Sequence, residues 1–355
     1  WAERENGAYE IALAAVNGLF ADAWLLRGQR RAIEKRLFGA ALIIVLLATY
    51  GAWRMRTTRL VPLAPVAIVQ PNIPQDEKWQ AANQANIINT LDRITRERLA
   101  QRDAKLVLWP EAALPGFIAE HPEWKRDLTL MAHGSHTPII FGTLDIVWHG
   151  PGDYDYYNAA MLADSTGTIN AQEPYRKSFL VPIVERVPFV NPRWFSHLKY
   201  FGGYGRGQNT DPFVLSFGKV GVLICYESIF PQLARDYAKQ GTAVLLNITN
   251  DAWFQRSNAP YQHFAHLSLR AIENRLPVVR AANTGISGWI DPLGRVRAET
   301  PIFVPRTATY QVEVTSTRTI YTRFGDWLGG LCAVITIGFL FAAWRAARQR
   351  RLATY

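Results

Sequence analysis

Short apolar runs separated by amphipathic segments dominate the middle of the chain. Residues 80–104 are polar overall but place isoleucine and leucine at helical spacing, which predicts an amphipathic helix. Helical patterns also cover residues 231–240 and 262–275. The apolar runs between them are typical of buried strands and cover residues 66–70, 106–108, 139–141, 220–224, 243–248 and 278–281. Strands that alternate with helices predict an α/β layered domain with a sheet covered on at least one face.

Proline and glycine mark two further features of this region. Residues 60–65 read Leu-Val-Pro-Leu-Ala-Pro, which predicts a linker before the first strand. Residues 285–297 contain Asp-Pro-Leu-Gly between two apolar stretches, which predicts a strand, a tight turn and a second strand paired antiparallel to the first.

Two longer apolar runs lie outside this region, at residues 37–53 and 327–346. A membrane-spanning helix needs about 17 to 25 residues, so both runs predict membrane spans. A third run, residues 8–26, is a weaker candidate because it carries Glu10 and Asp22. Since the chain begins at Trp1 without a methionine, we expect residues 1–59 to be the end of a longer N-terminal membrane domain.

The formal net charge of +10 at first indicates a nucleic-acid-binding protein, but the positions of the basic residues argue against this function. Five basic residues lie between residues 27 and 36, and an arginine-rich tail follows the last span. The positive-inside rule places both segments in the cytoplasm. The middle domain then lies on the opposite side of the membrane. Three basic residues at the other end of the span oppose this orientation: Arg54, Arg56 and Arg59. The orientation is still favoured, because the segment 27–36 carries five basic residues.

Three reactive side chains stand where apolar runs break. Glu111 follows a strand end, where a carboxylate is displayed as a general base. Cys225 lies at a strand-to-helix turn, where backbone N–H groups lower a thiol's pKa and bind an oxyanion. Lys177 precedes an apolar stretch that would enclose its ammonium beside a thiolate. Taken singly, the default interpretations are a solvated acid, a small core residue and a surface lysine.

The sequence offers no sign of a bound metal or cofactor. His263 and His266 lie near a predicted helix without a third ligand at metal-binding spacing. Phosphate-binding and dinucleotide-binding fingerprints are absent from the sequence. We therefore predict no cofactor and no metal.

Glu111, Lys177 and Cys225, in this order and with their flanking residues, resemble the nitrilase superfamily. Within it the chain resembles the apolipoprotein N-acyltransferase family, through residues 109–115, 156–160, 175–188, 225–231 and 247–254. The resemblance implies an αββα sandwich flanked by transmembrane helices. It divides the chain into membrane helices at 1–59, a catalytic domain at 60–318, and a C-terminal helix with a basic cytoplasmic tail at 319–355.

The resemblance also implies roles for individual residues. Glu111 would be the general base, Lys177 the oxyanion stabiliser and Cys225 the nucleophile that becomes a thioester. Glu185, Tyr226 and Glu227 would support them. The residues implied to bind substrate are Asn158, Trp253 and Phe254. By default, Glu185 would be a surface acid, Glu227 a carboxylate at a helix start, and the aromatic pair part of the core.

The implied function is transfer of an acyl chain from a phospholipid to the α-amine of the diacylglyceryl-cysteine of an apolipoprotein, at a bacterial inner membrane with a periplasmic catalytic domain. Residues 188–207, rich in aromatics and glycine, would form a lip at the membrane lipid or an ordinary loop. Val184 and Arg186 depart from the family pattern beside Glu185. Two alternatives remain open: a membrane-tethered amidase or other hydrolase, and a non-catalytic membrane scaffold.

Overall fold

The chain divides into two compact units, which we describe separately. The computed structural model describes residues 9–101, 103–169, 172–187, 189 and 203–352. One unit is Arg59–Thr317, and the other combines Trp1–Thr58 with Arg318–Tyr355.

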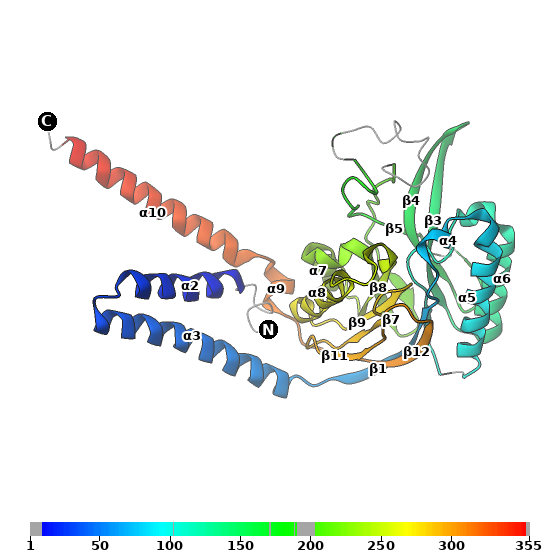
Figure 1. Cartoon of the computed structure of the whole chain (residues 1–355), viewed down its shortest axis with the longest axis horizontal. Helices are drawn as coiled ribbons and strands as arrows, with labels where there is room; N and C mark the ends of the chain where they lie inside the picture. The colour runs from blue at the N-terminus through cyan, green and yellow to red at the C-terminus, as the bar shows by residue number, and fades with distance from the viewer. Residues whose placement is uncertain (1–8, 102, 170–171, 188, 190–202, 353–355) are drawn as a thin grey trace. The chain divides into compact units, whose positions relative to one another are not determined.

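The first unit contains two six-stranded mixed sheets. The first sheet has the order β12-β1-β2-β3-β4-β5, and its central strands β1, β2 and β3 are parallel. The strands of this sheet are β1 Val61–Gln70, β2 Leu106–Leu108, β3 Ile139–Gly150, β4 Asp153–Ala163, β5 Tyr175–Arg176 and β12 Arg306–Val314. Helices α5 (Gln84–Leu99) and α6 (Pro122–Ser135) connect the parallel strands and cover one outer face (Figure 1).

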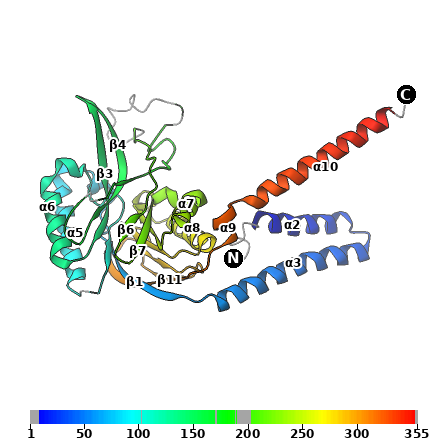
Figure 2. The same cartoon turned by 180° about the vertical axis from the view of Figure 1, so that it is seen from behind.

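The second sheet repeats this plan with the order β11-β10-β9-β8-β7-β6. Strands β7, β8 and β9 are parallel, and the others pair antiparallel at its edges. Its strands are β6 Phe213–Leu215, β7 Gly218–Ile224, β8 Val244–Thr249, β9 Val278–Ala282, β10 Gly288–Ile290 and β11 Val296–Glu299. Helices α7 (Pro231–Lys239) and α8 (Ala259–Asn274) cover the other outer face (Figure 2).

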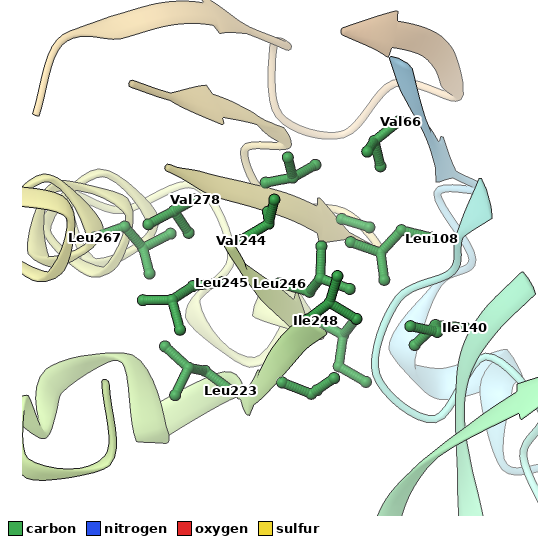
Figure 3. Packing of buried hydrophobic residues seen from close by; sticks show 14 of the residues in the cluster. Val66, Leu108, Ile140, Leu223, Val244, Leu245, Leu246, Ile248, Leu267 and Val278 are labelled. Atoms are coloured by element: carbon green, nitrogen blue, oxygen red, sulfur yellow. The ribbon is translucent and has the colours of Figure 1, made fainter. Parts of the chain in front are cut away.

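Alternation along the strands explains why the two sheets pack face to face. On β2, Leu108 points into the core between the sheets, while Val107 joins a second core with α5 and α6. Leu246 and Ile248 of β8 lie near Leu108, whereas Leu245 faces α8 (Figure 3). Strands buried on both faces need apolar side chains at every position, which is why these strands appear as continuous apolar runs in the sequence. The predicted α/β fold is confirmed.

Two sequence predictions can be compared with these elements. The predicted linker at residues 60–65 is wrong, because β1 begins at Val61 and pairs with β12 from there. Pro62 and Pro65 are tolerated because β2 joins β1 only from Val66, and a register irregularity falls between Pro62 and Ala64. The predicted tight turn is confirmed, since the Gly294 N–H donates to the Asp291 carbonyl at 2.8 Å.

The second unit is helical in the residues described. It contains α2 (Tyr9–Leu25), α3 (Arg30–Thr57), the short α9 (Ile320–Phe324) and α10 (Trp327–Leu352). Helices α2 and α3 lie side by side (Figure 1). Helix α3 and residues Gly329–Ala346 of α10 are long and apolar enough to cross a membrane, by length and composition.

A small residue sets the distance between β7 and α7. A Cβ atom on Gly221 would lie 2.4 Å from Cγ of the buried Tyr237. We expect Gly221→Ala to lower the free energy of unfolding by about 1–3 kcal/mol, because the ring cannot move within a filled core. Thermal and urea unfolding of the full chain in detergent would measure the loss.

Gly134 of α6 is the matched control, because its added Cβ would meet nothing within 4 Å. We expect Gly134→Ala to leave stability unchanged or to raise it by up to ~1 kcal/mol through helix propensity. Equal destabilisation by both substitutions would contradict this account of Gly221.

Candidate active site

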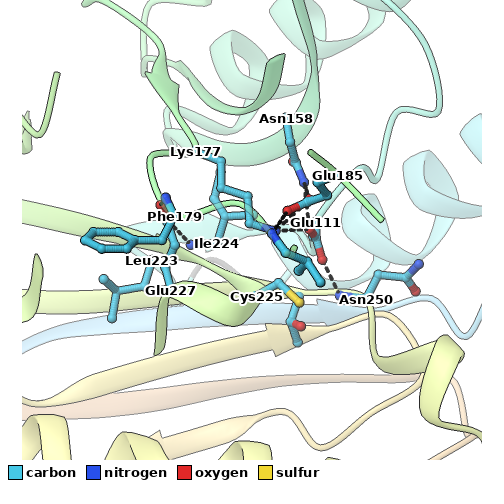
Figure 4. Close-up of polar contacts among 12 residues, drawn as sticks. Glu111, Asn158, Lys177, Phe179, Glu185, Leu223, Ile224, Cys225, Glu227 and Asn250 are labelled. Carbon is cyan, nitrogen blue, oxygen red and sulfur yellow. Dashed lines mark hydrogen bonds and ion pairs between the residues drawn. The ribbon is translucent and has the colours of Figure 1, made fainter. Parts of the chain in front are cut away.

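The carboxyl ends of parallel strands in the two sheets carry two of the predicted residues, and Lys177 follows the edge strand β5. Glu111 follows β2 of the first sheet, and Cys225 follows β7 of the second. Asn250 comes directly after β8, beside Cys225's strand. Ligand sites in α/β folds form at such ends, where connecting segments leave the sheet. In Figure 4 these segments meet around one cluster of polar side chains.

Glu111, Lys177 and Glu185 form a buried ionic cluster. The Lys177 Nζ lies 2.7 Å from Oε1 of Glu185 and 3.5 Å from Oε1 of Glu111. Lys177 is 1% exposed and Glu185 is 8% exposed, so neither is a surface residue. Burial alone would lower the pKa of Lys177, but the two carboxylates outweigh it and raise that pKa above its usual value. Lys177 is therefore a permanent ammonium in this structure.

Two asparagines hold the carboxylates in place. The Asn158 Nδ2 donates to Glu111 Oε1 at 2.7 Å and to Glu185 Oε1 at 3.3 Å. The backbone N–H of Asn250 donates to Glu111 Oε2 at 2.8 Å. Both oxygens of Glu111 thus have a donor within the protein. The Asn158 side chain thus bridges the two carboxylates through its Nδ2, and its role in substrate binding stays a prediction.

The turn that presents Glu111 is tightly constrained. Ala112 has a φ of 45°, in the left-handed region that β-carbon-bearing residues rarely adopt. A Cβ on Gly142 would lie 2.5 Å from the Pro110 carbonyl oxygen and 2.7 Å from the Glu111 Cα. Only a glycine on β3 leaves room for this turn. The Trp109 indole N–H donates to Thr95 Oγ1 at 3.0 Å and so ties the strand end to α5.

Cys225 begins the short 3-10 helix η4 (Cys225–Ile229) with a φ of 50°. Its sulfur is directed toward the Lys177 and Glu111 side chains (Figure 4). The expectation that the helix start lowers the thiol pKa is wrong. Burial, and next the Glu111 carboxylate, raise the pKa of Cys225 well above its usual value, while Lys177 and a hydrogen bond from Thr249 offset only part of this. The resting residue is a neutral thiol.

Glu227 joins the segments that carry Lys177 and Cys225. Its carboxylate is fully buried and accepts hydrogen bonds from the N–H groups of Ser178 at 2.7 Å, Phe179 at 3.0 Å and Ile224 at 2.8 Å. The Tyr175 hydroxyl donates to it at 2.8 Å. Burial raises the pKa of Glu227, although these donors oppose the shift. Glu227 lies in the first turn of the 3-10 helix Cys225–Ile229, as a carboxylate at a helix start would, and it also joins that helix to the Ser178–Phe179 segment.

A second buried network contacts the Cys225 backbone, and no sequence motif indicated it. His263 places Nε2 3.0 Å from the Cys225 carbonyl oxygen and Nδ1 2.9 Å from Asp251 Oδ1. Arg280 pairs with the other oxygen of Asp251. Burial alone would raise the pKa of Asp251, but Arg280 and His263 lower it to about 2. This network fixes the strained backbone of the cysteine.

A cavity of about 470 Å³ lies beside the cysteine's own turn. Its lining includes Tyr226 and Phe230 from that turn, the Ser178–Leu180 stretch that follows Lys177, and the side chains of Arg186 and Arg206. The Tyr226 ring packs edge-on against Phe230 at 5.1 Å between centroids. Tyr226, predicted to support the site, thus forms a wall of this cavity.

Trp253 and Phe254 lie elsewhere among the described residues. They belong to the 3-10 helix η5 (Asp251–Phe254), and Trp253 is 66% exposed. They are not core residues, and they do not line the cavity beside Cys225. Phe254 packs edge-on against His263. Most of the predicted lip, residue 188 and residues 190–202, lies outside the described residues.

Comparison with known proteins identifies the family. The family model for carbon-nitrogen hydrolases matches residues 65–321. The chain belongs to the carbon-nitrogen hydrolase family. Among solved structures, a carbon-nitrogen hydrolase from Helicobacter pylori G27 aligns with a TM-score of 0.54 at 16% identity, over 71% of this chain and 89% of that one. An amidase from Nesterenkonia sp. AN1 aligns with a TM-score of 0.52 at 18% identity, over 72% and 91%. These two likenesses show the fold.

Curated relatives narrow the family further. An apolipoprotein N-acyltransferase from Geobacter metallireducens is 34% identical over 82% of this chain and 56% of its own length. Another from Chlorobaculum tepidum is 30% identical over 92% of this chain and 66% of its own length. The suspected resemblance to this family is supported by both. The chain spans less than two thirds of the length of either relative.

Glu227 provides a test of how the site is held together. We expect Glu227→Gln to lower the free energy of unfolding by about 3–5 kcal/mol, because an amide nitrogen would face N–H groups inside the core. The exposed Glu299 of β11 is the matched control, and Glu299→Gln should stay within ~0.5 kcal/mol of the parent. Chemical unfolding of the full chain would compare them, and equal stability of the two variants would refute the central role of Glu227.

Proposed function

We propose that the protein is a membrane-bound N-acyltransferase of lipoprotein maturation. It moves an acyl chain from a phospholipid, through a thioester on Cys225, to the α-amine of the diacylglyceryl-cysteine of an apolipoprotein. The observation that carries this proposal is the convergence of Glu111, Lys177 and Cys225 at one buried site in a chain whose curated relatives are named apolipoprotein N-acyltransferases.

The first half-reaction forms the thioester. Glu111 accepts the proton of the Cys225 thiol as the sulfur attacks the ester carbonyl carbon. The Lys177 ammonium stabilises the negative charge that develops on the carbonyl oxygen. The carbon–oxygen bond then breaks, and Glu111 returns its proton to the departing lysophospholipid oxygen. Because the thiol pKa is raised, we expect the proton to leave as the sulfur attacks rather than beforehand.

The second half-reaction uses the same groups in the reverse direction. The acceptor amine attacks the thioester carbonyl, and the carbon–sulfur bond breaks as the amide forms. Glu111 accepts the proton that the amine loses and returns it to the Cys225 sulfur. Each cycle thus ends with the thiol and the carboxylate in their starting forms, as a ping-pong mechanism requires.

The cavity beside Cys225 supports a phospholipid donor. Phe179 and Phe230 supply apolar surface, with ring centroids 4.3 Å apart, and Arg186 and Arg206 supply positive charge on the same cavity. An acyl ester with a nearby phosphate matches both features. Helix α3 and α10 would hold the protein in the inner membrane, with the basic residues 27–36 and the C-terminal tail cytoplasmic and the catalytic domain periplasmic.

The test of this proposal follows the acyl chain. Purified protein in detergent is incubated with a phospholipid whose acyl chain is labelled, with and without a diacylglyceryl-cysteine peptide, and analysed by mass spectrometry. We expect a hydroxylamine-sensitive adduct on Cys225 that transfers to the peptide amine. Cys225→Ser should remove the thioester, while Cys332→Ser is the matched control and should keep it.

Each other outcome supports a different function. An adduct that is released only to water would support the amidase or hydrolase alternative. In the Nesterenkonia amidase, fluoroacetamide's acetamide moiety adds covalently to the active-site cysteine. Absence of any adduct from a folded, lipid-bound protein as long as its curated relatives would support the scaffold alternative.

Arg206 provides a test of the donor class. Its Nε donates to the Ser178 carbonyl at 3.0 Å, and its exposed guanidinium lies on the cavity. We expect Arg206→Gln to raise KM for the phospholipid about tenfold, the loss expected for one hydrogen-bonded charge. The control donor is an acyl p-nitrophenyl ester, which has no phosphate, and its KM should change less than about twofold. An equal rise for both donors would contradict phosphate recognition.

A further inference from the structure

A second lysine lies inside the site and has no role in the mechanism above. Lys78 ends the short helix α4 (Gln75–Lys78), which follows the carboxyl end of β1. It is 2% exposed, and its Nζ donates to the backbone carbonyl oxygen of Glu111 at 3.0 Å. Other connecting segments at this edge carry Glu111 and Cys225, and α4 adds a buried side chain from the segment that follows β1.

The same short helix reaches Glu111 by a second route. The Gln75 Oε1 accepts a hydrogen bond from Asn250 Nδ2 at 2.7 Å, and the Asn250 N–H donates to Glu111 Oε2 at 2.8 Å. Asn283, after β9, donates to Asn250 Oδ1 at 2.9 Å and to the Ile73 carbonyl at 2.8 Å. The backbone and the carboxylate of Glu111 are thus both linked to α4.

We propose that Lys78 is a positioning residue for Glu111, whose hydrogen bond to the Glu111 carbonyl fixes the strained turn that aims the carboxylate at the Cys225 thiol. The inference rests on the proposed role of Glu111 as the base.

A hydrogen bond that served only to stabilise the Glu111 turn would not require a charged lysine at position 78. Burial lowers the pKa of Lys78 to about 8, with Glu111 and Cys225 offsetting part of the shift, so the folded protein keeps the ammonium in an unfavourable environment. The hydrogen-bond acceptor of Lys78 is a carbonyl oxygen, which a neutral donor would satisfy without that cost. A charged lysine retained at such a position is typical of functional sites.

The test is a double-mutant cycle on the reactivity of Cys225, which needs no lipid. The rate of Cys225 alkylation by iodoacetamide is measured by peptide mass spectrometry in full-chain protein with Lys78→Met, with Glu111→Gln and with both. We expect Lys78→Met to slow alkylation roughly 10-fold to 10²-fold, as misplacement of a base does. The double variant should be no slower than Glu111→Gln, within about twofold.

Additive losses in the cycle, or alkylation of Lys78→Met at the parental rate, would overturn the inference. If Glu111→Gln alone leaves alkylation unchanged, the proposed base is wrong, which is a different failure. Lys125→Met, at an exposed position of α6, is the matched control and should react like the parent.

Lys78→Arg covers the case in which the methionine variant does not fold. Arginine keeps a positive charge and hydrogen-bond donors at this position. We expect this variant to be alkylated at no less than about a third of the parental rate. Its melting temperature, measured alongside, shows whether it is folded. A folded Lys78→Arg variant that reacts as slowly as Glu111→Gln would also overturn the inference.

Discussion

The buried cluster of Glu111, Lys177 and Glu185 is the interaction on which the rest of the site depends. Removing charges from water costs several kcal/mol per ion, so each must find partners inside the protein. Asn158 and the backbone of Asn250 supply donors to the carboxylates, and the Val181 N–H donates to Glu185 at 2.7 Å. These donors come from segments far apart in sequence. The cluster can exist only where the ends of several strands meet.

Charge balance then determines what the site can do at rest. Lys177 pairs with the carboxylates of Glu111 and Glu185, and the Lys78 ammonium is hydrogen-bonded to the Glu111 carbonyl oxygen, so the site holds two positive and two negative charges while the thiol is neutral. A thiolate would be a buried charge beside the Glu111 carboxylate, and burial first and that carboxylate second raise the pKa of Cys225. When the sulfur attacks a substrate, the negative charge develops on the substrate's carbonyl oxygen, where the Lys177 ammonium can stabilise it. The cluster thus favours a neutral thiol that gives up its proton during attack over a thiolate that is present at all times.

The sequence predicted the parts of the fold that depend on local patterns. Apolar runs located the parallel strands, and residues at their ends pointed to Glu111 and Cys225. Lys78 was missed because Gln-Asp-Glu-Lys resembles a solvated stretch, and its burial results from tertiary packing alone. The thiol pKa was mispredicted for the same reason: a helix start is visible in the sequence, whereas the burial of the thiol and the approach of the Glu111 carboxylate result from tertiary packing.

The packing of the two sheets also sets the geometry of the site. Glu111 and Lys177 follow strands of the first sheet, whereas Cys225 follows a strand of the second. Hydrogen bonds cross between the sheets at this edge: Asn250 donates to Glu111, and Ser178 and Phe179 donate to Glu227. A slide of one sheet over the other would break these bonds together. Interiors packed as densely as crystals resist such a slide. The apolar core between the sheets therefore determines the distance between thiol and base, although none of its side chains takes part in the chemistry.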